Sequence, residues 1–593
     1  MAAFGADGGS DSGTELKLLG RRPDSPTSGS DARARPEPAG RVELRWHDPL
    51  PWLRELSRHF GPKLLLMLFA SQHIIKGFVS AFIAQPTKFL YKSYDVPGPR
   101  MQILGGVAFL PWSMKPIIGL LSDALPIGGY NKAPYLLLTS ILGVAASGAL
   151  GALPHGRLAV EHVVACSFLL QLQFSTCDLL TEAKYAERMQ SKPEHGPDLL
   201  TFVWFGLQFG GLVGVALGGP MLHHFGAQTP FLLAAPAAGL ILVPLAANYL
   251  EERPVGPAEA RQARQRLAEE REVCLLCMLM LGGTVLLTVL GIAFASATVN
   301  AVAAIFVAFT MLAAFSLVLR PVIAKVNAFF LVQTSLTLSI SGASFYFFTD
   351  TPEQYPEGPH FSVEFFTSVL GIVGSVCSLI GIYSYQQYMK DWTYRGLLLM
   401  TNVVAALLSV TDVMVFLRLN RRWGLPDQLF VLGASALETI VGYWMWMPGI
   451  MITSQLCPRD MEATMYALLA GCHNLGMAIA SNCGALVLEL LDCAPSGAKG
   501  ESAQFRNLWV ASALSTLLPL GTLALLPWLI PAARQTDKIL EEGERSATAG
   551  SVWRRLAGGP DTEGPLLPPP GAAPGSWREV PVEVGRQLAH RPL

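Results

Sequence analysis

Stretches of about 20 mostly apolar residues recur along the whole chain, and charged residues, prolines and glycines gather between them. An α-helix needs about 20 residues to cross the hydrocarbon core of a bilayer. About fourteen stretches meet this requirement. They lie approximately at 62–84, 102–122, 133–153, 159–182, 199–223, 229–250, 273–295, 298–319, 323–348, 362–387, 395–418, 427–455, 462–490 and 505–530.

These runs predict helices because lipid offers no hydrogen-bond partners to the backbone, so a spanning segment must be a helix or part of a closed barrel. A barrel would show strands of about ten residues with alternating polarity, and the runs here do not alternate. The sequence therefore predicts an all-α, polytopic membrane protein.

The spans are grouped as six, two and six, which predicts two six-helix halves separated by two extra central helices. The predicted organisation is a disordered cytoplasmic N-terminal tail (1–60), an N-terminal half (61–250), a charged cytoplasmic loop (251–272), the two extra helices (273–319), a C-terminal half (320–530) and a disordered cytoplasmic C-terminal tail (531–593). Both tails are predicted to be disordered because they are rich in Gly, Pro and charge and have no apolar period.

The distribution of Lys and Arg among the loops predicts the orientation, since cytoplasmic loops carry more of them. The excess lies on the side of both termini, so both are predicted to be cytoplasmic. Arg418, Arg421 and Arg422 are a local exception, because they fall between spans on the opposite side. The N-terminal region resembles neither a secretory signal nor a transit peptide, which favours the plasma membrane, with an organelle membrane as the alternative.

Composition narrows the classes of function. Of the 593 residues 51% are hydrophobic and 15% charged, and the formal net charge is −1, so no basic field is available to attract nucleic acid. Cys274 and Cys277 form a CxxC pair, but no second pair or nearby histidine completes a metal site. No nucleotide-binding or catalytic motif occurs on the loops, so the sequence predicts neither an enzyme nor a cofactor.

Ionisable residues inside a span are energetically costly and are therefore candidates for function. Lys115 lies in the second span, directly before Pro116, and we expect it to face a water-filled cavity. The alternative is a lysine that snorkels or pairs with a neighbouring helix. In the first span, Gln72, Lys76 and Ser80 recur at steps of four and share one face.

The fourth span carries a polar stripe. Gln171, Ser175, Asp178 and Glu182 follow one another at steps of four, three and four, which places them on one face of a helix. Such a face is unfavourable in lipid, so we expect it to line the translocation path.

Two carboxyl groups, Asp412 and Glu438, lie in later spans. A carboxyl group in a low-dielectric medium holds its proton more readily, which suits a residue that takes up and releases a proton during transport. Glu438 is the deeper of the two and the stronger candidate. A structural hydrogen bond between helices remains the alternative for either residue.

One stretch resembles the signature of the folate-biopterin transporter family, a branch of the major facilitator superfamily. It runs from Trp112 to Tyr135 and contains Lys115, Pro116, Gly119, Asp123, Pro126, Gly128, Gly129, Lys132 and Pro134. Within it, the pattern of Gly119, Asp123 and Lys132 is similar to the superfamily's gating motif between the second and third helices. Physically, the aspartate can meet an opposing helix end or a basic group and latch the two halves.

Further stretches, 345–350, 418–421 and 456–467, are similar to the same family, and 325–329 and 470–476 are most similar to its protozoan branch. The resemblance implies a major-facilitator fold with extra central helices. It also implies uptake of folates or pterins such as biopterin by alternating access, with protons as the expected coupling ion. A folate is a dianion with a flat, hydrogen-bonding ring, which suits cations, amides and aromatic faces. Lys76, Lys115, Gln171, Asp178 and Trp112 are candidates of these kinds.

Two other readings remain open at this point. A major-facilitator-type transporter of another organic anion or metabolite would share every feature described above. A membrane receptor that has lost transport is a third possibility, although neither tail resembles a folded signalling domain.

Overall fold

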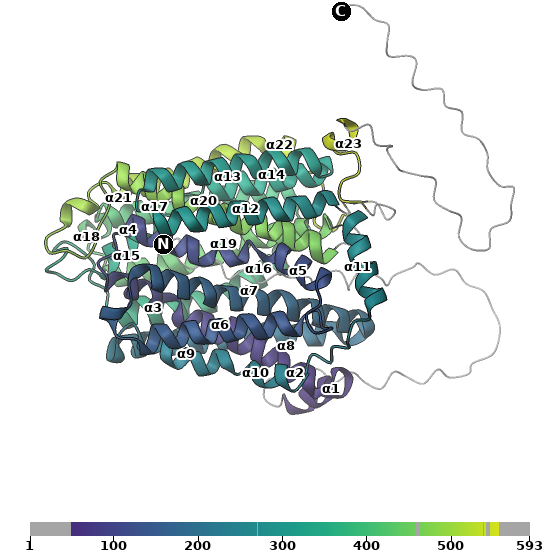
Figure 1. The fold of residues 1–593 in the computed structure, drawn as a ribbon. Coiled ribbons are helices and arrows are strands. Elements are labelled where there is room, and N and C mark those ends of the chain that lie inside the picture. The colour runs from purple at the N-terminus through teal and green to yellow at the C-terminus, as the bar shows by residue number, and fades with distance from the viewer. Residues whose placement is uncertain (1–48, 270, 458–461, 538, 541–545, 557–593) are drawn as a thin grey trace, which may run out of the picture.

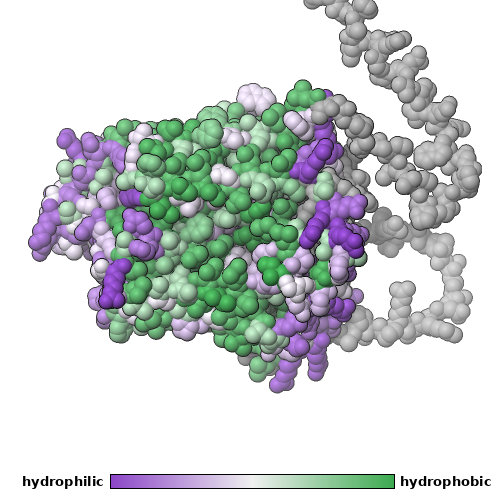
Figure 2. All heavy atoms as spheres, in the orientation of Figure 1, coloured by the Kyte–Doolittle hydropathy of each residue, from purple (hydrophilic) through white to green (hydrophobic). Residues whose placement is uncertain are grey.

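The structure is a computed structural model that describes residues 49–269, 271–457, 462–537, 539–540 and 546–556. Within these ranges nearly all regular structure is helical, and the helices lie roughly parallel in one bundle (Figure 1). Figure 2 shows a hydrophobic band around the middle of the visible face, with hydrophilic residues at both ends. This surface is the one that a bilayer requires of a spanning protein.

The N-terminal half supplies six spans. Its elements are α1 (Leu50–Phe60), α2 (Pro62–Leu68), the π-helix Phe69–Val79, α3 (Ser80–Lys92), α4 (Gly98–Phe109), α5 (Lys115–Ala124), α6 (Ala133–Ala152), α7 (Val160–Ser191), α8 (Gly196–Phe225), α9 (Thr229–Gly239) and α10 (Leu242–Ala246). The first span is continuous from α2 through the π-helix to α3, and the second is formed by α4 and α5.

The central linker and the extra pair come next. They consist of α11 (Pro257–Glu269), α12 (Arg271–Ala293) and α13 (Ala297–Val318). Helix α12 packs on α4 and α5, whereas α13 packs on α20 and α14 as well as on α12. The extra pair therefore lies against both halves, at the side of the bundle where α4 and α20 meet.

The C-terminal half has its own six helical segments. Its elements are α14 (Pro321–Leu336), α15 (Ser341–Thr349), the π-helix Phe365–Val369, α16 (Leu370–Tyr388), α17 (Tyr394–Phe416), α18 (Leu419–Arg422), α19 (Asp427–Gln455), α20 (Glu462–Leu490), α21 (Leu508–Leu520) and α22 (Leu526–Leu529), followed by α23 (Val552–Leu556).

Thirteen helical segments of the described chain are long and apolar enough to cross a membrane. The remaining predicted span corresponds to α20, a helix of 29 residues that packs on helices of both halves. Its polar residues, which include His473, Asn474 and Asn482, make it less apolar than the others. The predicted all-α fold with two six-helix halves and an inserted pair is confirmed.

The ends of the bundle differ. Helices α1, α11 and α23 lie at one end, which we call the tail end, and α18 and the loop after α15 lie at the opposite, distal end (Figure 1). The motif residues 458–461 are outside the described residues, as are 1–48 and 557–593.

Parts of both predicted tails pack on the tail end. In α1, Trp52, Leu56 and Phe60 are buried against Leu199 and Val203 of α8. This amphipathic helix lies within the segment 1–60 that the composition indicates to be disordered.

The segment after Pro531 is likewise in contact with the bundle. Gln535 is buried; its Nε2 donates to the carbonyl of Met389 at 2.8 Å, and the Tyr385 hydroxyl donates to its Oε1. Farther along, Arg554 pairs with Glu272 of α12 at 3.1 Å. These contacts are made by single polar side chains without an apolar period, which is why the sequence pattern does not reveal them.

Some of the arginines that are an exception to the excess of positive residues on the cytoplasmic side are paired with a carboxylate. Arg418 contacts both oxygens of Asp427 at 3.0 Å, and Asn420 donates to the same carboxylate at 2.7 Å. Arg421 lies 3.6 Å from Asp427 and is largely exposed. The local exception is thus a distal-end ion-pair cluster around one buried aspartate.

Candidate functional site

A buried ion triad lies inside the N-terminal half. Lys76 Nζ is 2.7 Å from Asp178 Oδ1, and Lys115 Nζ is 2.6 Å from Asp178 Oδ2. All three side chains are less than a tenth exposed. Two ammonium groups and one carboxylate leave one net positive charge, held away from water, where electrostatic interactions are strong. We call these residues the central triad.

Local backbone irregularities place the two lysines. Lys76 lies in the π-helix Phe69–Val79, an element that often occurs at functional sites. Lys115 is the first residue of α5, after the second span breaks at a short 3-10 turn, Leu110–Trp112. Pro116 fits the first turn of α5 because that position has no intrahelical N–H bond to lose. The break turns Lys115 toward α7.

Aromatic rings flank both lysines. Lys115 Nζ lies 4.6 Å from the centre of the Trp112 ring, and Lys76 Nζ lies 5.7 Å from that of Trp204. Such cation–π contacts favour a positive charge beside the ring face. The Trp112 indole donates to Gln171 Oε1 at 2.7 Å, which joins the Gln171 end of the polar stripe to the second span. Trp204 is a neighbour that the sequence pattern does not identify.

The other polar residues of these spans have different partners. Gln72 Nε2 donates to Thr181 Oγ1 at 2.8 Å, which ties the first span to α7. Ser175 bonds to its own helix, at the carbonyl of Leu172. Tyr185 donates to Glu182 at 3.4 Å. Asp178 is therefore the stripe residue that meets charged groups from two other spans.

Several buried polar atoms around the central triad have no hydrogen-bond partner among the described residues. They lie on the segments that carry the triad or on α8 beside it: Ser71 Oγ, His73 Nε2, Ser113 Oγ and Trp204 Nε1. Buried polar groups are normally satisfied, so unsatisfied donors and acceptors of this kind are suited to a bound polar molecule.

Close packing of the first span on α8 sets the shape of this region. A Cβ atom on Gly206 would lie 2.1 Å from the His73 ring, and one on Gly210 would lie 2.3 Å from the His73 carbonyl oxygen. Glycine is therefore required at both positions for the two helices to approach. The imidazole of His73 also contacts the ring of Phe202.

Of the gating-motif residues, Gly119 and Asp123 lie on α5, and Lys132 directly precedes α6. Asp123 is exposed, and the positive charge of Lys132 is close enough to act on it. Gly119 faces Leu179 with ordinary spacing. A gating role for Gly119, Asp123 and Lys132 stays a prediction.

A different residue holds the loop that contains the motif. Glu252, at the start of the central linker, accepts hydrogen bonds from the backbone N–H groups of Asn131, Lys132 and Ala133 at 2.8–2.9 Å. This carboxylate lies at the N-terminus of α6, where a negative charge is favoured. Arg264 of α11 also donates to the carbonyl of Ala124 at 3.0 Å. The central linker, which is not part of the N-terminal half, thus holds this loop in place through hydrogen bonds.

In the C-terminal half, Glu438 of α19 and Asp412 of α17 are half-buried and close enough to interact electrostatically. The Oε1 atom of Glu438 is buried and has no hydrogen-bond partner among the described residues. The structure thus brings together Lys76, Lys115, Gln171 and Asp178, whereas Glu438 belongs to a separate carboxyl pair in the other half.

The two halves also meet near the central triad. Asn474 of α20 donates to the backbone carbonyl of Trp112 at 3.3 Å. Farther toward the distal end, Gln102 Nε2 donates to the carbonyls of Ser339 and Ser481, both at 2.9 Å. Gln102 is a buried connection between the halves that the sequence pattern does not identify.

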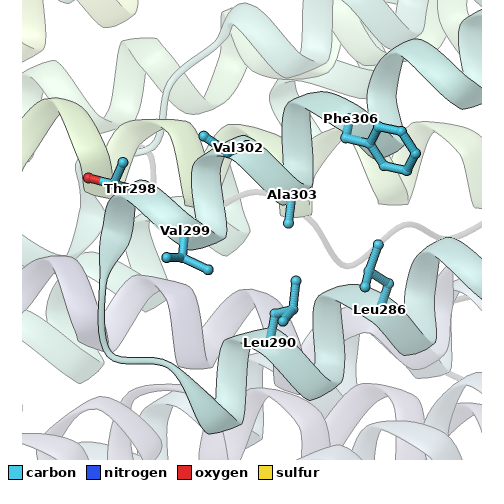
Figure 3. Close-up of a pocket in the computed structure, with 7 residues that line it drawn as sticks. All are labelled: Leu286, Leu290, Thr298, Val299, Val302, Ala303 and Phe306. Carbon is cyan, nitrogen blue, oxygen red and sulfur yellow. The ribbon is translucent and has the colours of Figure 1, made fainter.

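An apolar groove of about 480 Å³ lies between the extra helices α12 and α13 (Figure 3). Its lining residues are Leu286, Leu290, Thr298, Val299, Val302, Ala303 and Phe306. Val302 and Phe306 are more than half exposed on the hydrophobic surface. A single hydroxyl group cannot satisfy a polar anion, so this groove is a lipid-facing surface and not a counterpart of the central triad.

Comparison with known proteins adds an independent line of information. A model of the BT1 family matches residues 76–549. A protein of Arabidopsis thaliana named probable folate-biopterin transporter 2 is 26% identical over 497 residues, covering 83% of this chain and 88% of the relative. The folate-biopterin transporter of Synechocystis sp. is 26% identical over 480 residues, covering 79% and 82%.

Solved structures share the fold at low sequence identity. A peptide transporter of the POT family in complex with sulfate superimposes with a TM-score of 0.55 and 15% identity, over 81% of this chain and 99% of that one. A D-xylose-proton symporter gives a TM-score of 0.51 at 11% identity, over 82% and 99%. The architecture is therefore that of these transporters.

Proposed function

This chain belongs to the BT1 family, and we propose on that premise that it is a secondary transporter that moves folates or pterins across a membrane by alternating access. It spans most of the length of relatives that carry the name of folate-biopterin transporter. The same relationship gives no support for an enzymatic role.

The single observation that carries the proposal is the central triad. Asp178 holds two lysines in place, so the cations are preorganised without being fully neutralised. An anionic group that enters can share Lys76 or Lys115 with Asp178, because each ammonium group has three donors. Folates carry carboxylates, which can supply the anionic group that binds the lysines.

The surroundings of the central triad fit a flat heterocyclic ring. Trp112 and Trp204 offer aromatic faces and indole edges, and the unpaired atoms of Ser71 and Ser113 offer hydrogen bonds. Gln171 can exchange its bond with Trp112 for one with the ring. A site of this composition selects an anion that also has a planar, hydrogen-bonding part.

Glu438 is the proposed proton carrier, with Asp412 as its neighbour. Two neighbouring carboxyl groups repel one another when both are ionised, so a proton bound to either of them would relieve the repulsion. Because Glu438 lies in the C-terminal half and the central triad in the N-terminal half, the proton and the substrate would bind to different halves.

The proposed orientation has both termini in the cytoplasm, which makes the tail end cytoplasmic and the distal end external. The plasma membrane is the proposed location, with an organelle membrane as the alternative. A short epitope inserted into the 491–501 loop, which follows α20 at the distal end, tests the orientation. If the distal end is external, an antibody should reach this epitope on intact cells without permeabilisation.

Uptake of labelled folate and labelled biopterin by cells that express the full chain tests the substrate. We expect saturable uptake of at least one of them above that of cells expressing Asp178→Asn at equal surface amount. Absence of both uptakes with normal surface expression would reject folates and pterins as substrates.

The second candidate function is transport of another organic anion, which the net positive charge of the central triad also favours. Competition by a panel of unlabelled anions distinguishes the two candidates. Imposed pH gradients test the coupling ion: uptake should rise with an inward proton gradient, and Glu438→Gln should remove this dependence while exchange of substrate continues.

A further inference from the structure

Among the described residues, a lysine–aspartate pair and a histidine–glutamate pair join the N-terminal half to the C-terminal half at the distal end. Lys92 Nζ at the end of α3 is 2.6 Å from Asp350 Oδ1, which directly follows α15. His223 near the end of α8 is 3.0 Å from Glu364. The second pair is half exposed, whereas the Lys92 side chain is 16% and the Asp350 side chain 0% exposed. Exposed pairs contribute little to stability, whereas removal of one partner of a buried pair is strongly destabilising, so disruption of the Lys92–Asp350 pair should have the larger effect.

The ammonium group of Lys92 is fully engaged by the opposite half. Besides Asp350, it donates to the backbone carbonyl and the hydroxyl of Thr349 at 3.1 and 3.2 Å. It also lies 5.1 Å from the centre of the Tyr346 ring. All three donors of this cation are therefore used by the C-terminal half, which makes the contact sensitive to any separation of α3 from α15.

The backbones around this pair are in close contact. The Tyr346 hydroxyl donates to the carbonyl of Val96 at 2.7 Å. A Cβ atom on Gly342 would lie 1.8 Å from the carbonyl oxygen of Gly98, so α15 touches the start of α4 through two glycines. The rings of Phe89 and Phe345 lie edge to face at 5.0 Å. The distal end is thus sealed by polar, aromatic and backbone contacts between the halves.

We propose that Lys92 and Asp350 form a latch that holds the distal end closed and that must break in every transport cycle. This inference rests on the proposed transport function, because rocking of the two halves is what separates α3 from α15. The central triad, in contrast, lies within one half and keeps its internal geometry during such a movement. The conformation described is the one in which the latch is closed.

The chemistry of a buried pair predicts an asymmetry between single and double substitutions. Removal of one partner leaves the other charge buried and unpaired in the closed state, whereas opening exposes it to water. Single variants should therefore shift the equilibrium toward the open distal end. Exchange of the two charges restores the pairing and should restore closure.

The experiment measures distal accessibility without substrate. A cysteine introduced as Ala343→Cys, at a fully buried position of α15, reacts with a membrane-impermeant maleimide added from the distal side. The labelling of native cysteines is measured on the chain that lacks this substitution and is subtracted. We expect the labelling rate to rise about tenfold or more in Lys92→Met and in Asp350→Asn. In Lys92→Asp/Asp350→Lys it should return to within about threefold of the parent.

Lys499→Met is the matched control, since Lys499 is also a distal lysine paired with a carboxylate, Glu353, but both side chains are largely exposed. Its labelling rate should stay at the parent value. The latch would be overturned if the labelling rate were unchanged in both single variants. It would also be overturned if the charge-exchange variant were labelled as fast as the single variants. Because labelling needs no substrate, a chain that moves neither folate nor biopterin but shows the expected labelling would reject the substrate and retain the latch.

Discussion

The central triad and the distal latch are both buried pairings of lysine with aspartate, but they connect different parts of the molecule. Lys76, Lys115 and Asp178 all belong to the N-terminal half, whereas Lys92 and Asp350 come from opposite halves. In the triad two cations share one carboxylate, whereas in the latch one cation contacts Asp350, and the Glu501 carboxylate is close enough to act on both. A pairing inside one half can stay formed while the halves move, so it suits binding, and a pairing between halves reports their relative position.

The comparison also explains why charge balance differs between the two places. The net positive charge of the central triad suits a site that an anion can enter and bind. At the latch, Asp350 compensates the charge of Lys92 and so lowers the cost of burying it in the closed state. Substitutions at the two places should therefore affect different measurements.

The largest expected effect follows from Asp178→Asn, which leaves two buried lysines without their carboxylate. Loss of one partner of a buried ion pair costs about 3–5 kcal/mol of stability, and here it also releases both lysines of the proposed site, so we expect uptake at equal surface amount to fall on the order of 100-fold or more. Lys115→Met should have a similar effect, because it removes the excess cation. Distal labelling of these variants should remain near the parent rate.

The measurement is initial uptake of labelled folate or biopterin at equal surface amount. Lys115→Arg, which keeps the charge, is the control and should retain more uptake than Lys115→Met. Parent-like uptake in both Asp178→Asn and Lys115→Met would remove the central triad from the binding site.

An intermediate effect is expected for Gly342→Ala at the distal contact. The added Cβ would overlap the Gly98 carbonyl, so the closed state should be disfavoured by about 1–3 kcal/mol, as for other overpacked sites. The change should raise distal labelling while leaving the charges of the latch in place. Gly105→Ala is the matched control on α4, since a Cβ there meets no atom within 4 Å. Equal labelling of the two variants would contradict a close contact at Gly342.

The smallest effect is expected for Trp112→Phe, which keeps a ring beside Lys115 but removes the indole N–H that binds Gln171. One hydrogen bond of this kind contributes about 0.5–1.5 kcal/mol, so KM for uptake should rise a few-fold with little change in the maximal rate. A second variant, Trp112→Ala, removes the ring face as well and should have a larger effect. Identical kinetics for Trp112→Phe and the parent would show that the Trp112–Gln171 bond has no part in binding.

Several features of the site could be predicted from sequence alone. Steps of three and four residues placed Gln171 and Asp178 on one face of α7, and the cost of charge in lipid singled out Lys76 and Lys115. The residue that holds the loop of the gating motif could not be predicted. Glu252 acts through three backbone N–H groups of a distant turn, and such a contact leaves no periodic signal.

The same limit applies to the ends of the chain. A composition rich in Gly, Pro and charge indicates disorder because it lacks an apolar core. In the described part of the C-terminal segment, Gln535 nevertheless bridges Tyr385, Met389 and Gln455 through hydrogen bonds. Individual polar side chains docked on a preformed helical surface give order that composition does not encode.

The amino-acid sequence by itself determined that this chain spans a membrane with two six-helix halves and an inserted pair, because lipid imposes long apolar helices whatever their arrangement. It also determined which charges are buried in the spans. Only the tertiary structure decided how those charges pair. Asp178 lies 102 residues from Lys76 and 63 from Lys115, and Asp350 lies 258 residues from Lys92. Such partners are selected by helix packing, which depends on all neighbouring side chains at once and not on the local pattern around any one of them.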